Sequence, residues 1–120
     1  MEACRVEERG HPSGIPVVAV TGYLAKEGGV LLKDCVYKLL AAGKIRILVD
    51  FSACSVISSP GVSAVLDIVC RTHEDHNGTC VLVGLDGTKK RFLTMMGVLP
   101  MAYEADAVDQ AIAILQRDAV

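Results

Sequence analysis

Two adjacent serines lie where a buried strand of this chain passes into a helix. Apolar, mostly β-branched residues at positions 45 and 47–49 predict a strand, and residues 62–69 repeat apolar side chains at the spacing of one helix face. The Ser-Ser-Pro-Gly-Val segment between them, residues 58–62, is called the serine turn below. Ser59 is expected to cap the helix through its hydroxyl, and Pro60 suits the first helical position, where no N–H is needed. Hydroxyls and free N–H groups at a helix start often carry function in α/β domains.

The other residues that could bind a metal or a phosphate, or catalyse a reaction, do not form a convincing site. Cys70, His73, His76 and Cys80 have a zinc-like spacing, but zinc would need all four to converge tetrahedrally. Cys80 is expected to begin a buried strand while both histidines lie at a helix-to-turn junction, so we expect no metal site. The glycine and lysine run at residues 84–90 lacks the spacing of a Walker phosphate loop. No nucleophile, base and acid share a catalytic spacing, so we expect neither enzyme activity nor a cofactor.

The composition is typical of one soluble domain spanning residues 1–120. A hydrophobic content of 52% allows a sizeable core, and a net charge of −2 gives no sign of nucleic-acid binding. The chain starts without the apolar stretch of a signal peptide, and no run approaches the roughly 18 apolar residues of a spanning helix. The odd number of cysteines, mostly within apolar runs, favours reduced thiols. We therefore expect a cytoplasmic protein without membrane insertion.

The pattern of apolar and turn-forming residues predicts nine elements in the order β-β-α-β-α-β-α-β-α. Strands are expected near residues 4–6, 15–21, 44–51, 80–83 and 101–104, and helices over 30–42, 59–77, 88–96 and from 106 onward. Asp50 and Ser52 are expected to end the third strand, residues 26–29 to form a turn, and Gly43 to stop the first helix. Phe92, Leu93 and Met96 are expected to point inward.

Strands that alternate with helices of this length predict a mainly parallel sheet, with the opening pair as the antiparallel exception. The predicted fold class is therefore α/β: a sandwich with a mostly parallel sheet of about five strands and about four helices.

This order and several short strings resemble the STAS domain of bacterial anti-sigma factor antagonists. Residues 49–52 (Val-Asp-Phe-Ser) match the end of the family's central strand, and residues 56–62 align with its switch turn without a gap. Residues 20–25 match the glycine and leucine of the loop after its second strand. Counterparts also occur at residues 81–84, 93–98 and 106–111, so that the resemblance covers nearly the whole chain.

The resemblance implies a protein-binding module that works by partner switching. In this family the unphosphorylated domain binds an anti-sigma factor and so releases the sigma factor, and phosphorylation of the second hydroxyl residue of the turn abolishes that binding. Pro60 occupies this position and has no hydroxyl, while Ser58 and Ala25 replace two acidic residues of the family pattern. We favour a constitutive binder, or one switched elsewhere, with Ser59 and Ser58 as alternative candidate phospho-acceptors.

The resemblance also implies a partner and a surface. The expected partner is an anti-sigma factor of the serine-kinase-like ATPase type, and the chain itself is expected to be a monomer or weak dimer. Asp50 has two open interpretations: it orients the turn or contacts the nucleotide site of a partner kinase, or it accepts hydrogen bonds from loop N–H groups. The candidate surface residues are Leu24, Ala25, Asp50, Ser58, Ser59, Pro60, Gly61 and Val62.

Two other functions stay open. STAS-like subunits also accompany lipid-transport ATPases without being governed by the usual phosphoserine, and the missing hydroxyl at Pro60 suits this alternative. A small-ligand sensor would instead show a sizeable pocket between the sheet and the helices.

Overall fold

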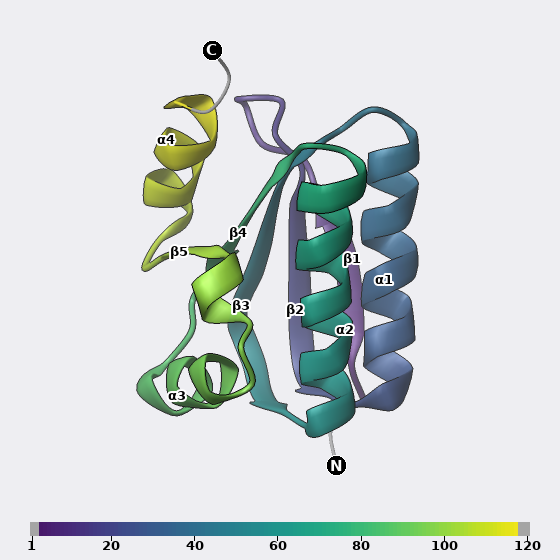
Figure 1. Cartoon of the computed structure of the whole chain (residues 1–120), viewed down its shortest axis with the longest axis vertical. Coiled ribbons are helices and arrows are strands. Elements are labelled where there is room, and N and C mark those ends of the chain that lie inside the picture. The colour runs from purple at the N-terminus through teal and green to yellow at the C-terminus, as the bar shows by residue number, and fades with distance from the viewer. Residues whose placement is uncertain (1–2, 118–120) are drawn as a thin grey trace.

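The structure, a computed structural model, describes residues 3–117 and contains a five-stranded sheet with helices on both faces (Figure 1). The elements follow the predicted order, which confirms the α/β class. They are β1 (Arg5–Arg9), β2 (Val17–Leu24), α1 (Lys26–Ala41), β3 (Arg46–Ile57), α2 (Ser59–Cys70), β4 (Thr79–Val83), α3 (Gly87–Met95), β5 (Tyr103–Ala105) and α4 (Val108–Arg117). A π-helical turn at Arg71–Asp75 extends α2, and a 3-10 turn at Leu99–Met101 precedes β5.

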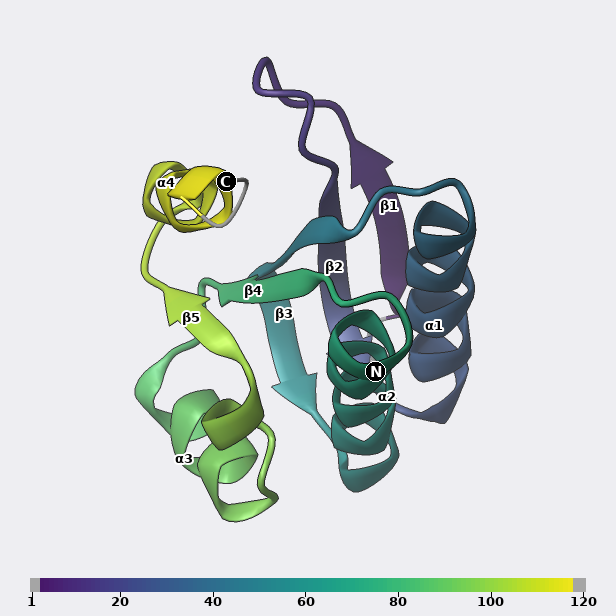
Figure 2. The ribbon, with the colours of Figure 1, turned by 45° about the horizontal axis from the view of Figure 1, so that its top comes forward.

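The sheet has the strand order β1-β2-β3-β4-β5. β1 runs antiparallel to β2 and every other neighbouring pair is parallel, as predicted. Helices α1 and α2 pack side by side on one face, and α4 covers β3 and β4 on the other (Figures 1 and 2). The parallel strands need these helices as crossovers, so the sheet is buried on both faces along its middle strands.

Burial on both faces explains the continuous apolar run of β3. Ile47 and Val49 belong to the larger core cluster under α1 and α2, whereas Leu48 belongs to the smaller cluster under α4. In the smaller cluster Ile112 and Leu115 of α4 close over the sheet. The apolar patterns of the third strand and of the last helix therefore predicted these core positions correctly.

The predicted end of the third strand is wrong. β3 passes through Asp50 and Ser52 and continues to Ile57, because β2 remains paired with it as far as the Leu24–Ile57 pair. The Asp50 carboxylate accepts hydrogen bonds from the backbone N–H of Ser52 at 2.9 Å and from the Ser52 hydroxyl at 2.6 Å. The β2–β3 register shifts at this point, between the Ala19–Asp50 and Thr21–Ala53 pairs, and β3 continues beyond it.

The turn expected at residues 26–29 is also wrong, since α1 already begins at Lys26. Gly28 and Gly29 are buried within the helix, and a Cβ on Gly29 would lie 2.9 Å from the Cβ of Ala64. The glycines allow α1 to approach α2 closely, so packing overrides their low helix propensity. At the other end Gly43 does stop the helix, with a φ of 85°.

In the third helix the prediction holds only in part. Leu93 is fully buried and Phe92 is half-buried, but Met96 is 45% exposed. The helix ends at Met95, and Gly97 then turns the chain in a left-handed conformation, so Met96 no longer follows the inward face.

Candidate functional site

The serine turn lies where the carboxyl ends of β2 and β3 meet the start of α2. The backbone N–H of Ser58 donates to the carbonyl of Leu24 at 2.9 Å, and the Ser58 hydroxyl oxygen accepts from the N–H of Gly61 at 3.3 Å. Ser58 has an extended backbone and is therefore the N-cap. The prediction that Ser59 caps the helix is wrong: because β3 and α2 meet at Ser58, Ser59 is the first helical residue and Pro60 the second.

The residues of the turn divide into a buried and an exposed group. Leu24, Gly61 and Val62 are buried, so they support the turn and offer a partner no side-chain surface in this conformation. Ser59 and Pro60 are exposed, and Ser58 is half-buried. Of the two candidate phospho-acceptors, the Ser59 hydroxyl is therefore the more accessible.

Gly61 is the residue that allows α2 to start directly against the end of β2 at Leu24. A Cβ at this position would collide with the carbonyl oxygen of Leu24 and would lie 3.1 Å from Cγ2 of Ile57. The turn is thus fixed by a backbone hydrogen bond, a cap and a close backbone approach. None of these three features involves the side chain of residue 60.

The neighbouring loop joins the turn in one surface. Ala25 accepts the first hydrogen bond of α1, from the N–H of Gly29 at 2.8 Å, and a Cβ on Gly29 would lie 3.6 Å from the carbonyl oxygen of Pro60. Ala25 is half-buried, and Lys26 beside it is exposed. The starts of α1 and α2 therefore lie together, as the predicted binding surface requires.

Asp50 does not join this surface. Asp50 pairs with Ala19 and Ile57 with Leu24, so the two β3 residues are five steps of β2 apart, roughly 17 Å along the strand. Its carboxylate is bound to the N–H and hydroxyl of Ser52. The geometry agrees with the interpretation that Asp50 satisfies local donors.

Exposed apolar side chains close to the turn (Val56) and to the loop at residues 24–27 (Leu31) were missed in the sequence. Val56 is 55% exposed two residues before the turn, and Leu31 of α1 is 47% exposed. Leu31 borders a hollow of about 390 Å³ that Tyr23 and Ala25 also line. In the helical pattern of α1, Leu31 lies outside the buried stripe that contains Leu32 and Val36. This helical phase is the signal in the sequence that would have indicated an exposed apolar residue.

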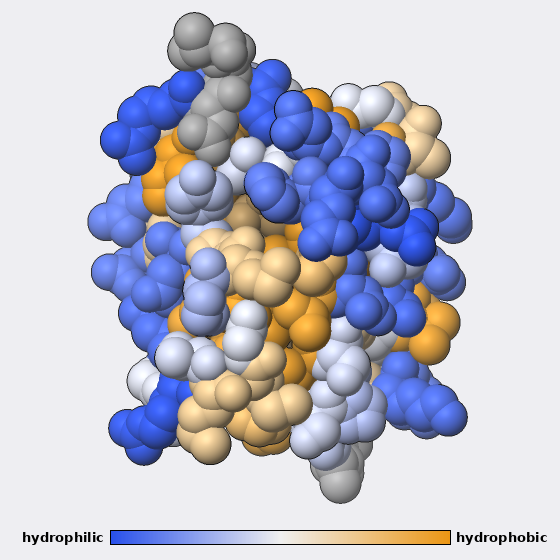
Figure 3. Space-filling model, viewed as in Figure 1, coloured by the Kyte–Doolittle hydropathy of each residue, from blue (hydrophilic) through white to orange (hydrophobic). Residues whose placement is uncertain are grey.

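A second apolar surface covers the chain between α3 and β5. Met95, Met101 and Tyr103 are each exposed by about half or more, and Phe92 and Leu99 are half-buried beneath them. Figure 3 shows apolar surface over this part of the molecule, between polar flanks. Exposed methionines adapt to partners of different shape, and such surfaces are typical of protein binding.

The zinc-like spacing does not converge in the described residues. No group of three or more histidine, cysteine or acidic side chains lies close enough there to hold a metal ion. Cys80 is buried in β4, and burial raises the pKa of its thiol to about 12, which disfavours the thiolate that zinc requires. His73 is exposed after α2.

Within residues 3–117 no helix has both the length and the apolar character that crossing a bilayer requires. Comparison with the curated proteins finds no match.

Solved structures share the fold. Unphosphorylated SpoIIAA, an anti-sigma factor antagonist of Bacillus, superposes with a TM-score of 0.71 at 20% identity, over 97% of this chain and 100% of that one. An anti-sigma factor antagonist from Mycobacterium paratuberculosis gives a TM-score of 0.77 at 20% identity, over 95% of each chain. A variant of RsbS from Moorella thermoacetica gives 0.80 at 21% identity, over 96% of this chain and 97% of that one.

The sequence profile of the STAS domain matches residues 8–111. Since this match spans most of its length, the chain belongs to the STAS domain family.

Proposed function

We propose that this chain is an anti-sigma factor antagonist that acts by binding and exchanging protein partners. The observation that carries the proposal is the exposed start of α2, where Ser59 and Pro60 project from a turn whose other residues are buried or half-buried. Similarity to anti-sigma factor antagonists of the same fold supports it. The protein is a cytoplasmic binding module, and it needs neither an enzyme activity nor a cofactor for this role.

The partner is an anti-sigma factor of the serine-kinase-like ATPase type. It binds the serine turn, the loop at residues 24–27 and the exposed face of α2. Val56 and Leu31 flank this surface and supply apolar contact area, which the centre of a protein interface needs.

Regulation at the usual position is lost, because Pro60 carries no hydroxyl for a phosphate. Ser59 is the alternative acceptor: it is exposed, and a phosphate there would lie at the positive end of α2. Phosphorylation would place about −1.5 to −2 charges in the middle of the interface and so weaken binding.

The alternative function is an accessory subunit of a lipid-transport ATPase. The missing hydroxyl at Pro60 favours it, since such a subunit needs no phosphoserine switch. Both functions use a protein surface, so identifying the partner distinguishes them.

Calorimetric titration of the purified chain tests the proposal, with a kinase-like anti-sigma factor from the same genome as the partner. We expect Ser59→Asp to weaken binding at least tenfold, because it adds a charge at the turn. Gln116→Glu adds one negative charge to the exposed face of α4 and should leave the affinity unchanged. Equal affinities for both variants would place the interface elsewhere, and binding only to a transport ATPase would establish the alternative.

A further inference from the structure

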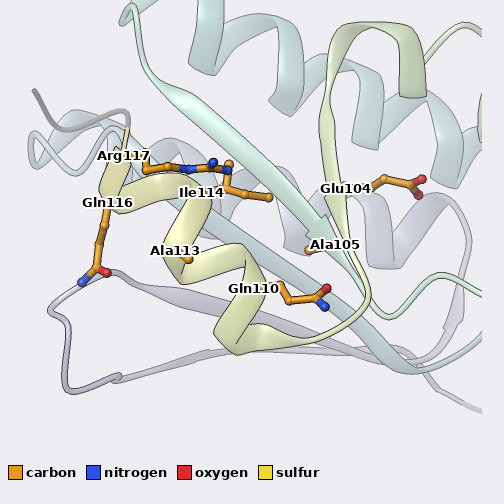
Figure 4. A pocket seen from close by; sticks show the side chains of 7 residues that line it. All are labelled: Glu104, Ala105, Gln110, Ala113, Ile114, Gln116 and Arg117. Carbon is orange, nitrogen blue, oxygen red and sulfur yellow. The ribbon is translucent and has the colours of Figure 1, made fainter.

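A groove separates the edge strand β5 from the outer side of α4. It has a volume of about 660 Å³ and is open to solvent. Ala105 of β5 and Ala113 and Ile114 of α4 form its apolar part, and its polar lining consists of Glu104, Gln110, Gln116 and Arg117 (Figure 4). The Glu104 carboxylate points away from α4, so Arg117 is the charged group on the helix side of the groove. The groove shares no residue with the serine turn, so its function is independent of the one proposed above.

The strand beside the groove has one free edge. β5 pairs with β4 from Tyr103 to Ala105 on one side, and it ends the strand order of the described chain on the other. Backbone N–H and C=O groups on such an edge are a template for one more strand. A ligand that fits this edge is an extended peptide segment, which can form backbone hydrogen bonds with β5 and pack its side chains against α4, as in β-strand addition.

The side chains of the groove restrict the chemistry of the segment. Alanines at positions 105 and 113 leave room for small or β-branched apolar residues, which pack against Ile114. Figure 4 shows the Arg117 side chain reaching back along α4 toward Ile114, so its guanidinium group lies at the groove wall. A guanidinium group in this place favours a carboxylate in the occupant.

A second copy of this chain fits the edge poorly. Two β5 strands paired antiparallel about a two-fold axis through their central residue would bring the two Glu104 carboxylates directly opposite each other. Like charges in directly opposed positions destabilise a strand pair.

From these observations we infer that the β5–α4 groove binds an extended acidic segment of a partner protein. The segment adds a sixth strand to the sheet at β5, packs alternate apolar side chains on Ala113 and Ile114, and places a carboxylate against Arg117. The chain thereby holds a second partner while the serine turn remains accessible.

The probe for this inference is a synthetic peptide, acetyl-Ser-Val-Ser-Val-Ser-Asp-Ser-Ser-amide, in which both valines and the aspartate share one face of the strand. It is titrated into the full chain and followed by amide NMR. We expect shifts confined to residues 103–105 and 108–117, with slower amide exchange in β5. The same peptide with lysine in place of aspartate should bind about fivefold more weakly. The absence of shifts up to millimolar peptide, shifts centred on the serine turn, or equal binding of both peptides would each overturn the inference.

Charge reversal at the groove wall gives the second test. Arg117→Glu should lower the affinity for the aspartate peptide about fivefold and make the lysine peptide the better ligand. Arg117→Gln should fall between the two, and Arg91→Glu, which reverses an exposed arginine on α3, should leave both affinities unchanged. All of these positions are exposed, so the fold is not at risk. An unchanged preference in Arg117→Glu contradicts the inference.

Discussion

The identity of the α2 cap leads to a prediction that separates two adjacent serines. Ser58→Ala removes the hydroxyl that accepts from Gly61, whereas Ser59→Ala removes an exposed hydroxyl from the first helical residue. Loss of an N-cap costs about 1 kcal/mol, and the 3.3 Å cap bond is at the long end of the usual range, so we expect about 0.5–1 kcal/mol for Ser58→Ala. Ser59→Ala should lie within about 0.5 kcal/mol of the wild type, because alanine suits a helix at least as well as serine.

Urea unfolding followed by circular dichroism measures the difference. With a slope of about 1.5 kcal/mol per molar, Ser58→Ala should lower the midpoint by about 0.5 M, and Ser59→Ala should barely move it. Ser58→Asp is the rescuing control, because a carboxylate also caps and interacts favourably with the helix N-terminus. An equal loss in both alanine variants would refute the assignment of the cap to Ser58.

Three further predictions concern close packing, an ion pair and a thiol. Gly61→Ala should lower the unfolding free energy by about 2 kcal/mol, because its Cβ meets the carbonyl group of Leu24. The control is Gly87→Ala at the start of α3, which has open space around it and should be neutral or slightly stabilising in the same urea assay. Asp86→Asn keeps a capping side chain but removes the carboxylate 2.7 Å from the buried Lys89 ammonium, so its urea midpoint at pH 7 should be lower. The hydrogen bond from Lys89 lowers the pKa of Asp86 below its ordinary 3.8, so this stabilisation is present above pH 3.8 and is lost as the pH falls below the lowered pKa. The urea midpoints of the variant and the wild type should therefore converge at low pH. A difference that stays constant with pH would contradict the reasoning. Cys80, with a thiol pKa raised to about 12, should resist iodoacetamide at pH 8 in the native protein and react after unfolding, as mass spectrometry of the labelled peptides would show.

The fold could be predicted because burial of apolar side chains, its largest stabilising contribution, is visible as the periodic spacing of apolar residues in the sequence. The apolar run of residues 47–49 indicated a strand buried on both faces, and the apolar stripes of the helices indicated one buried side each. Leu48 and Leu115 belong to the same core cluster in the structure, in agreement with these patterns. Gly43 marked the end of α1 because its left-handed conformation suits a helix stop.

The errors in the third strand, in the helix cap and at the start of α1 occur where a distant contact outweighs a local preference. Asp50 and Ser52 usually end a strand, but pairing with β2 continues β3 to Ile57. This extension moves the helix start back by one residue, so Ser58 becomes the cap in place of Ser59. Gly29 usually breaks a helix, yet its contact with α2 keeps it inside α1. None of these contacts can be read from neighbours in the sequence.

The exposed apolar residues beside the turn were missed for a different reason. Val56 and Leu31 have the same residue types as core residues, and only the exact helical phase or strand register shows that they face outward. A one-residue error in β3 reverses that assignment, because successive strand residues point to opposite faces.

For the proposed function, the geometry of the serine turn predicts that binding and regulation are separable. The turn is fixed by the Leu24 carbonyl, the Ser58 cap and the close approach of Gly61, and none of these three features depends on the side chain of residue 60. Pro60→Ser should therefore leave the affinity for the unphosphorylated state within about twofold. It should also lower the unfolding free energy by about 0.5–1 kcal/mol, through greater freedom of the unfolded chain.

The same variant should gain a phosphorylation site. Incubated with a kinase-like partner and ATP, Pro60→Ser should take up phosphate at residue 60 and then lose affinity, while the wild type takes up none there. Phosphopeptide mapping and titration before and after the reaction measure both properties on one sample. A large loss of affinity in Pro60→Ser before any phosphate is added would contradict separability, because it would mean that the proline ring itself belongs to the binding surface.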